Sequence, residues 1–319
     1  MSAFGGSNTN LGLTNFRKSV ATSSAGIGTI SKKLAIVGGG NMASAIISSI
    51  YASKTMGEDG MKDITVVDID AAKLKEFERQ FGVSWSLSLK EGCAGADMLI
   101  LCIKPQSLDK VSLELAELDF DSKNTLIVSI LAGVNMKRLQ ESIPTCSNFV
   151  RVMPNTPIAV LEGVSVWYSY SRNKGGVAQE DLDRLKLLLS SSGEEIRVDN
   201  EELIEMATAI SGSGPAYIFL LAETMIDTGV HLGFPRHIAT ALALQTIRGS
   251  ISYAKQAPEN LAELRYKVTS PGGTTASAVY ELEKGRFRTV VADAIWSALR
   301  RARELGEKDP NVGPGRNQY

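Results

Sequence analysis

A glycine-rich turn near the start of the chain has the composition of a phosphate-binding loop. In the stretch K-L-A-I-V-G-G-G-N-M-A, Gly38, Gly40 and Ala43 fit the pattern G-x-G-x-x-(G/A) between an apolar run and a helical stretch. Gly38 permits a tight turn, Gly40 lets the backbone approach a pyrophosphate, and Ala43 allows close helix packing. The amide groups at the helix start, including those of Asn41 and Met42, then face the phosphates. The segment predicts a dinucleotide site, although a glycine-rich turn without a ligand is the alternative.

An acidic residue follows at a position that matters for such a cofactor. Asp68 closes the second apolar run, from where a carboxylate accepts hydrogen bonds from the adenosine ribose diol. Because a carboxylate repels a 2′-phosphate, Asp68 favours NADH, with NADPH as the alternative cofactor. Asp68 could instead cap the next helix, but Asp70 is the better cap because the helical pattern starts at Ala71.

Three later segments place prolines, small residues and hydroxyls at the ends of predicted elements. R-V-M-P-N-T-P (Arg151–Pro157) ends a strand in a turn, and S-G-S-G-P-A-Y (Ser211–Tyr217) leads into an apolar helix. V-T-S-P-G-G-T-T-A (Val268–Ala276) places amides and hydroxyls at a helix N-terminus, a suitable site for a carboxylate. Alternatively, each segment is a helix cap with a tight turn.

The elements that must position these segments alternate along the first part of the chain. From Lys33 onward, short β-branched apolar runs alternate with longer amphipathic stretches, the pattern of a parallel sheet covered by helices. The apolar runs suit strands buried on both faces. The predicted strands are Leu34–Val37, Ile64–Asp68, Met98–Ile103, Leu126–Ile130, Phe149–Met153 and Val164–Trp167, with helices such as Met42–Ser53 and Ala71–Gln80 between them.

The pattern changes after about Gly193, beyond which we find no convincing strand. Tyr217–Val230 is apolar nearly all round, so one subunit's own surface does not cover it. We therefore expect a homodimer, or a higher homo-oligomer, that buries this helix. The predicted helices of this second part are Leu203–Ile210, Tyr217–Val230, His237–Lys255 and Thr274–Leu305.

Composition and charge exclude several classes of partner. With 319 residues, 44% of them hydrophobic, the chain predicts two domains around a large apolar interior. A formal net charge of -1 argues against nucleic acid or an anionic membrane as a partner. The sequence has no run of roughly 18 apolar residues that would predict a membrane span. Three cysteines without C-x-x-C spacing argue against a disulfide framework or a metal site, and favour a reducing compartment.

The ends of the chain differ from the rest in composition. Residues 1–32 are basic and contain no acid, which predicts a disordered tail or, alternatively, an organelle transit peptide. We predict a dinucleotide-binding domain over 33–198, a helical substrate and dimerisation domain over 199–306, and a second disordered tail over 307–319. We expect a cytoplasmic protein, or an organellar one if the first segment is a transit peptide.

Taken together and in this order, the motifs resemble those of the pyrroline-5-carboxylate reductase family, from about Lys33 to Gly306. The resemblance implies an α/β fold, with an N-terminal Rossmann domain built on a doubly wound parallel sheet and a C-terminal all-helical dimerisation domain. It also implies NAD(P)H-dependent reduction of 1-pyrroline-5-carboxylate to L-proline at sites on the dimer interface. The motifs that carry it are V-G-G-G-N-M-A, C-I-K-P-Q (Cys102–Gln106), S-I-L-A-G-V (Ser129–Val134), R-V-M-P-N-T-P, S-G-S-G-P-A-Y, V-T-S-P-G-G-T-T and E-L-E-K-G-x-F-R (Glu281–Arg288).

The resemblance also assigns roles to residues of this chain. Lys104 and Pro105 would border the cofactor, and Ala132 and Asn155 would lie near its nicotinamide end. The substrate carboxylate and ring nitrogen would be held by Ser270, Gly273, Thr274 and Thr275. Among these, we expect the Thr275 hydroxyl to bond the ring nitrogen, while the amides of Gly273 and Thr274 meet the carboxylate.

Two departures from the family pattern and two rival functions remain. L-R-Y-K-V (Leu264–Val268) replaces the family's Leu-Lys-Asp-x-Val, and many members lack an acid where Asp68 stands, so cofactor preference stays open. A β-hydroxyacid dehydrogenase is the enzymatic rival, but its K-x-x-x-N motif is missing at the corresponding place. A non-catalytic nucleotide-binding regulator would be expected to lose T-S-P-G-G-T-T, which is intact.

Overall fold

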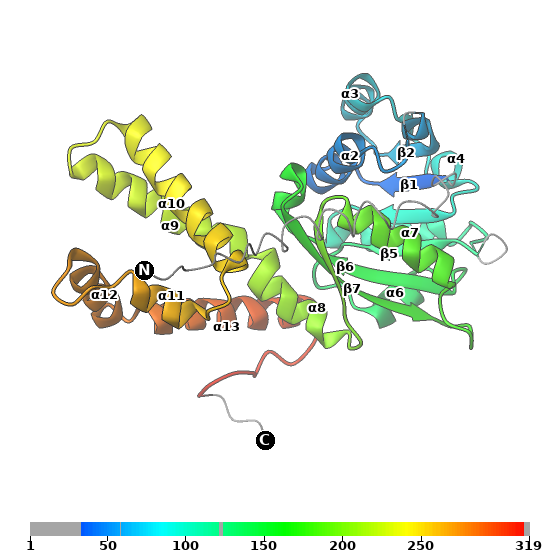
Figure 1. Ribbon diagram of the computed structural model, residues 1–319. Helices are drawn as coiled ribbons and strands as arrows, with labels where there is room; N and C mark the ends of the chain where they lie inside the picture. The colour runs from blue at the N-terminus through cyan, green and yellow to red at the C-terminus, as the bar shows by residue number, and fades with distance from the viewer. Residues whose placement is uncertain (1–32, 58, 121–123, 316–319) are drawn as a thin grey trace, which may run out of the picture.

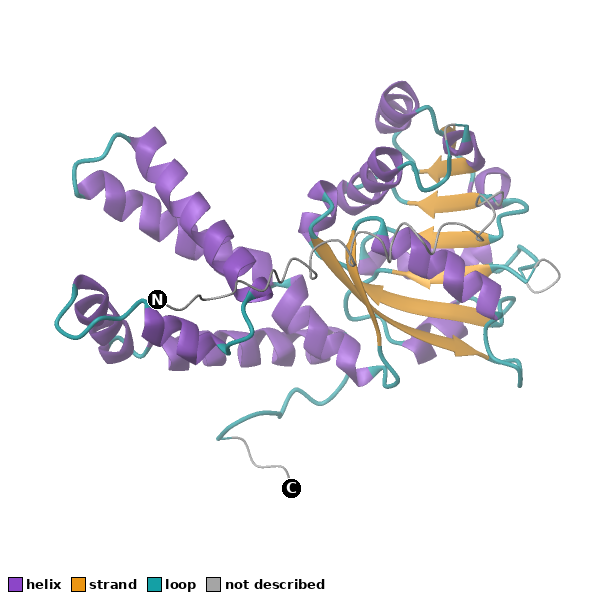
Figure 2. Cartoon of the chain, viewed as in Figure 1, coloured by secondary structure: helices purple, strands orange, loops and turns teal. Residues whose placement is uncertain are grey.

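The computed structural model describes residues 33–57, 59–120 and 124–315, which form a sheet domain and an elongated helical domain (Figure 1). All strands lie in the first domain, whereas the second consists of helices alone, as Figure 2 shows. The predicted tail or transit peptide over residues 1–32 lies outside the described residues.

An eight-stranded sheet organises the first domain in the order β3-β2-β1-β4-β5-β6-β7-β8. Its central strands are parallel, with Leu34 of β1 facing Ile64 of β2 on one side and Met98 of β4 on the other. Chain order reverses beside β1, which is the switch point of a doubly wound fold. The strands are β1 (Leu34–Val37), β2 (Ile64–Val67), β3 (Ser84–Ser86), β4 (Met98–Leu101), β5 (Leu126–Ser129), β6 (Asn148–Met153), β7 (Gly163–Ser171) and β8 (Gly193–Arg197).

Helices cover both faces of this sheet. Alternation along β1 directs Leu34 and Ile36 into one apolar cluster and Ala35 and Val37 into the other. The first cluster is closed by α2 (Asn41–Ser53), α3 (Ala71–Phe81) and α7 (Gln179–Ser190), and the second by α4 (Leu89–Cys93), α5 (Leu108–Leu115) and α6 (Met136–Ser142). The predicted doubly wound architecture is therefore confirmed.

The sheet differs from the predicted one at its edges. β7 runs antiparallel to β6 because the short 3-10 segment η3 (Thr156–Val160) joins them in place of a crossover helix. The expectation that no strand remains after about Gly193 is wrong, since β8 begins there and pairs with β7. β8 and the three-residue β3 lack the apolar pattern of a buried strand because both lie at edges of the sheet.

The helical domain begins with one continuous helix. α8 (Glu202–Ala207) runs through a π-helical turn, η4 (Thr208–Gly212), into α9 (Gly214–His231). It is followed by α10 (Arg236–Gln256), α11 (Leu261–Lys267), α12 (Thr274–Lys284) and α13 (Phe287–Leu305). α8 packs on β6 and β7 and α13 packs on α8 and η4, so these elements join the two domains.

Two details of this domain depart from the predicted helices. The single helix expected over Thr274–Leu305 breaks between α12 and α13, where Arg286 has a left-handed φ of 59°. α11 was not predicted, although Asn260 and Glu263 form a capping box at its start. Part of the segment predicted as a second disordered tail has defined contacts, since the Arg303 side chain donates to the Asp309 carbonyl at 2.7 Å.

The helices α9 and α10 project away from the sheet as a pair (Figure 1). Large apolar side chains of α9 remain open to solvent in the single chain, with Phe219 and Leu220 each 65% exposed and Leu221 38% exposed. Such a contiguous apolar surface indicates that another molecule covers it. The expectation that one chain does not bury this helix is confirmed.

The continuous helix Glu202–His231 is also long and apolar enough to cross a bilayer, judged by length and composition alone. The sequence predicted no such span, because the apolar run within α9 is shorter than roughly 18 residues when the turns of α8 that precede it are left out. Only 17% of its most apolar stretch is buried in the single chain. Glu223 and Asp227 interrupt the apolar sequence of this helix, and an uncovered apolar face is equally what a subunit interface presents.

Candidate active site

The glycine loop lies where the carboxyl ends of β1, β2 and β4 meet. The Gly38 amide donates to the Val67 carbonyl at 2.7 Å, and the Cys102 amide donates to the Val37 carbonyl at 2.7 Å. Gly38 has a φ of 103°, and a Cβ there would lie 2.8 Å from the Cys102 carbonyl carbon. Both the backbone conformation and the available space therefore require glycine.

Gly40 and Ala43 serve the same loop in different ways. Gly40 is the N-cap of α2 with no side-chain hydrogen bond, and a Cβ there would meet no atom within 4 Å. The first amides of α2, at Asn41 and Met42, therefore border open space, as an anion site requires. Ala43 is fully buried under the loop, where a larger side chain would separate helix from sheet.

Asp68 follows β2 and is already bonded to the loop. Its Oδ2 accepts from the Gly39 amide at 2.6 Å, and its Oδ1 accepts from the Asp70 amide at 2.9 Å. Asp70 caps α3 by accepting from the Ala72 and Lys73 amides, as predicted. The carboxylate of Asp68 therefore holds the glycine loop in shape at the position from which a ribose would be bound.

The remaining predicted cofactor residues follow the next three strands. Lys104 and Pro105 start the 3-10 segment η2 (Pro105–Ser107) after β4, Ala132 lies in the turn after β5, and Asn155 follows β6. Because β4, β5 and β6 are parallel neighbours, their carboxyl ends share one edge with the glycine loop. Asn155 Oδ1 accepts from the Val164 amide at 2.9 Å, so this side chain also fixes the turn into β7.

The thiol of Cys102, which follows β4 at this edge, is unreactive. Burial raises the pKa of Cys102, whose backbone contacts Gly38, so the thiol remains protonated at neutral pH. A neutral, half-buried thiol is a poor nucleophile. The edge can bind and orient a ligand, but Cys102 does not supply covalent catalysis.

The second candidate segment forms the N-terminus of α12. Gly273 is the N-cap with no side-chain hydrogen bond, and its own amide donates to the Ser270 carbonyl at 3.0 Å. A Cβ at Gly273 would lie 2.5 Å from Ser270 Oγ, so a larger residue there would displace the Ser270 hydroxyl. Thr274 is exposed and Thr275 half-buried at the uncapped start of the helix. Amides and hydroxyls thus converge where a carboxylate is favoured.

The structure does not bring these two segments together within one chain. α12 lies at the far end of the helical domain from β1 and α2 (Figure 1). The residues predicted to bind the cofactor thus share one edge of the sheet, while Ser270, Gly273, Thr274 and Thr275 form a separate cluster.

Comparison with known proteins identifies both domains. The family model described as pyrroline-5-carboxylate reductase dimerisation matches residues 201–305, and that described as NADP oxidoreductase coenzyme F420-dependent matches residues 33–133. The chain is 39% identical over 279 residues to the pyrroline-5-carboxylate reductase of a Synechocystis species, covering 88% of this chain and 100% of that protein. The chain belongs to the pyrroline-5-carboxylate reductase family.

Solved structures of pyrroline-5-carboxylate reductases have the same fold. The enzyme from Coxiella burnetii is similar with a TM-score of 0.76 and 32% identity, covering 86% of this chain and 98% of that chain. The Plasmodium falciparum enzyme, solved with NADP bound, has a TM-score of 0.76 and 29% identity, covering 88% of this chain and all of that one. The rival assignment to β-hydroxyacid dehydrogenases is therefore not favoured.

The reductase fold also contains contacts that sequence reasoning missed. The π-helical turn η4 approaches the end of β6, where a Cβ on Gly212 would lie 2.7 Å from the Cε methyl carbon of Met153. The Tyr217 hydroxyl donates to the Ala209 carbonyl of this turn at 3.0 Å, and the Thr208 hydroxyl donates to the Ile204 carbonyl of α8 at 2.8 Å. S-G-S-G-P-A-Y thus shapes a junction between the domains, and its small residues and tyrosine were the available signal.

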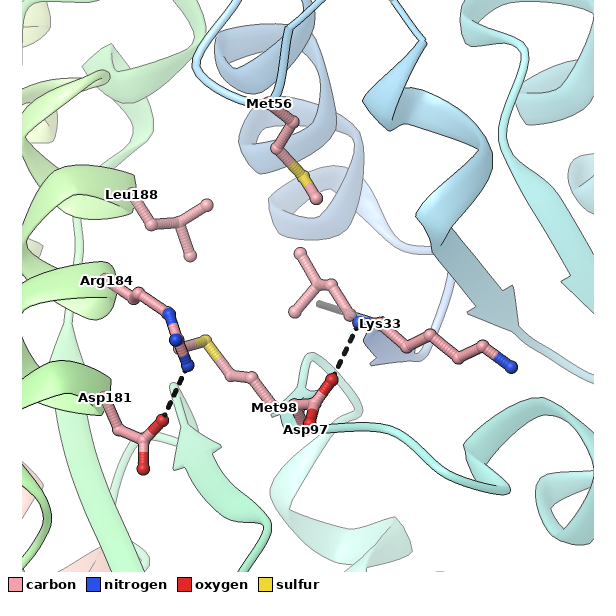
Figure 3. Close-up of a pocket in the computed structure, with 8 residues that line it drawn as sticks. Lys33, Met56, Asp97, Met98, Asp181, Arg184 and Leu188 are labelled. Carbon is pink, nitrogen blue, oxygen red and sulfur yellow. Dashed lines mark hydrogen bonds and ion pairs between the residues drawn. The ribbon is translucent and has the colours of Figure 1, made fainter. Parts of the chain in front are cut away.

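A small pocket at the opposite edge of the sheet is not a substrate site. It lies between the start of β1, the end of α2 and α7, lined by Met56, Met98 and Leu188, with the Lys33 amide donating to Asp97 at 3.0 Å (Figure 3). Its volume of about 30 Å³ accommodates water but not a metabolite. It also faces the amino ends of the strands, whereas ligands of such folds bind at the carboxyl ends.

Proposed function

We propose that the chain reduces 1-pyrroline-5-carboxylate to L-proline, the final step of proline biosynthesis, with NADPH or NADH as hydride donor. Hydride passes from nicotinamide C4 to the imine carbon, and the cofactor supplies this chemistry when bound. The observation that carries the proposal is the uncapped N-terminus of α12, because the intact S-P-G-G-T-T segment gives this reductase fold a carboxylate site.

The cofactor residues divide by what each offers. Amides at Gly40, Asn41 and Met42 would meet the pyrophosphate, with Gly38 and Ala43 shaping the loop. Asp68 would accept from the ribose diol, which favours NADH over a 2′-phosphorylated cofactor. Lys104, Pro105, Ala132 and Asn155 follow the next strands along the same edge and would border the nicotinamide half.

The substrate residues need no strong acid among them. An imine that arrives protonated is the better hydride acceptor, so the site must stabilise and orient it. The amides of Gly273 and Thr274 would meet the carboxylate, and Ser270 would border it. The Thr275 hydroxyl, half-buried at the first turn of α12, would bond the ring nitrogen.

We further propose that two subunits complete the site. The dimerisation match over residues 201–305 indicates a homo-oligomer, and the exposed apolar face of α9 is the surface a second subunit would cover. Since α12 lies far from the glycine loop in one chain, a homodimer would bring one subunit's α12 to the other's cofactor. This assembly also explains the long apolar helix as a subunit interface and not as a membrane span. We further propose that the reaction takes place in the cytoplasm.

The test is absorbance of the reduced nicotinamide with 1-pyrroline-5-carboxylate. We expect oxidation of the cofactor only when the imine is present, with proline as the product. A β-hydroxyacid dehydrogenase would instead reduce the oxidised cofactor in a second mixture that contains a hydroxyacid. A non-catalytic regulator would bind the nucleotide with no absorbance change in either mixture, which would refute the proposal.

A further inference from the structure

Four charged side chains meet in a buried network where the two domains join. Arg151 of β6 forms ion pairs with Glu201 and with Glu205, the latter at 3.2 Å. Lys308 reaches the same Glu205 from beyond α13, with its Nζ 3.2 Å from both carboxylate oxygens. The side chains of Arg151 and Glu205 are 4% and 3% exposed, so this pair is withdrawn from water.

The network is anchored to backbone on both sides of the junction. Glu201 also accepts from the amide of Met136, at the start of α6, at 2.6 Å. The C-terminal turn of α13 is held nearby, because the Asn135 side chain donates to the Gly306 carbonyl at 3.4 Å and Leu305 packs against Gly133. The segment Leu305–Lys308 therefore lies between α6 of the sheet domain and α8 of the helical domain.

Such a network is better suited to fixing geometry than to adding stability. Burying charges carries a desolvation cost, and a buried ion pair is often no more stable than apolar residues of the same size. Arg151 of the sheet domain pairs with Glu201 and Glu205 of the helical domain, so another arrangement of the two domains would leave its buried charge unpaired. Lys308 holds Glu205 in place for this contact from within the helical domain. Exposed pairs, such as Lys137 with Glu141 at 3.9 Å, contribute little by comparison.

We propose that Lys308 and the Arg151–Glu205 pair are positioning residues that set the orientation of the helical domain on the cofactor domain. This inference rests on the proposed function, in which a loop carried by one subunit's helical domain must meet a nicotinamide held by the other subunit's sheet domain. Lys308 lies beyond the matched dimerisation region, which ends at residue 305, and within the segment predicted to be a disordered tail. The chain end thus has a role in catalytic alignment.

Lys308→Met tests the proposal, because it removes the charge, keeps a side chain of similar length and leaves the Arg151–Glu205 pair in place. We expect kcat to fall about tenfold with KM for the imine changed less than about twofold, since small displacements mainly affect alignment. Lys308→Arg should retain kcat because it keeps the charge. The matched control is Lys137→Met, which removes an exposed lysine from α6 and should leave kcat unchanged.

Two further measurements separate alignment from stability and from the proposed function. Small-angle X-ray scattering of the intact oligomer should show a broader distribution of domain positions in Lys308→Met than in Lys137→Met, whatever reaction the protein catalyses. Glu205→Gln should broaden it further. A Lys308→Met protein with wild-type kcat and scattering, even with a lower melting temperature, would overturn the proposal. An inactive wild-type protein whose scattering still responds to Lys308→Met would refute only the proposed reaction.

Discussion

The two loops that carry the proposed chemistry differ in how completely one chain builds them. The glycine loop is held on several sides, by the Val67 carbonyl, by the Cys102 backbone and by the Asp68 carboxylate. The turn before α12 is held mainly by its own neighbours, through the Gly273 bond to Ser270 and the Thr269 hydroxyl bond to Arg265. Most side chains around α12 are exposed in the single chain.

This difference separates what folds alone from what requires association. A site whose conformation is fixed inside one domain should bind its ligand whether or not subunits associate. A site on an extended, uncovered helical domain should depend on the partner that covers it. Cofactor binding and catalysis are therefore expected to respond differently to loss of the oligomer.

The largest effect should come from Leu221→Glu, which separates the subunits. A charge placed in an apolar contact costs several kcal/mol, so the protein should become monomeric or insoluble and lose imine reduction. Any soluble monomer should still bind cofactor. Leu113→Glu is the control, because Leu113 is 73% exposed on α5 of the sheet domain. Light scattering that shows a well-behaved Leu221→Glu dimer would remove the interface assignment.

Next in size is the contrast between two glycines of the same loop. Gly38→Ala forces a side chain into a left-handed backbone and against Cys102, a strain of about 1–3 kcal/mol before any shift of the loop. We expect weaker cofactor binding and a lower melting temperature. Gly40→Ala meets no protein atom, so it should weaken cofactor binding without lowering the melting temperature. Calorimetry and cofactor titration on both variants distinguish the two glycines. An equal fall in melting temperature in both variants would contradict the assignment of Gly40 to an open ligand site.

Much of the cofactor region could be predicted because its signals are local. The apolar run Leu34–Val37 matches β1 residue for residue, and α2 and α3 begin within a residue of their predicted starts. Asp70 was predicted as the cap of α3 from the adjacent helical pattern alone. Apolar periodicity and cap residues depend on neighbours in sequence, which is why these predictions succeed.

The unpredicted features depend on residues far apart in sequence. Nothing near Glu205 indicates that Arg151 and Lys308 will meet it, and no local pattern predicts that Asp68 bonds Gly39. β8 was missed because G-E-E-I-R has the composition of a solvent-facing edge strand. The separation of α12 from the glycine loop could not be predicted, because it depends on the path of the whole helical domain. Loop motifs carry no information on the distance between domains.

Substitution of Thr275 tests the proposed substrate loop most directly. If its hydroxyl bonds the imine nitrogen, Thr275→Ala removes one donor, a loss of roughly 1–3 kcal/mol or about tenfold to a hundredfold in kcat/KM. Cofactor affinity should barely change, because the glycine loop is built without α12. Thr275→Ser keeps the hydroxyl and should retain most activity. Steady-state kinetics and melting temperatures decide: full activity in Thr275→Ala, with or without lost stability, means that the threonine has no catalytic role.

The smallest expected effect concerns Asp68, which both shapes the glycine loop and faces the ribose position. Asp68→Ser removes the charge that should repel a 2′-phosphate, so the NADH/NADPH ratio of kcat/KM should fall about tenfold, or roughly 1.4 kcal/mol. Asp68→Asn is the control for the loop, because its amide oxygen can still accept from the Gly39 amide while the charge and the bond from the Asp70 amide are lost. If charge sets the preference, both variants shift the ratio, and the melting temperature of Asp68→Asn falls less than that of Asp68→Ser because Asn keeps the bond from the Gly39 amide. If Asp68 acts only through the loop, binding of NADH and NADPH weakens equally in Asp68→Ser and the ratio does not change, which would exclude the ribose assignment.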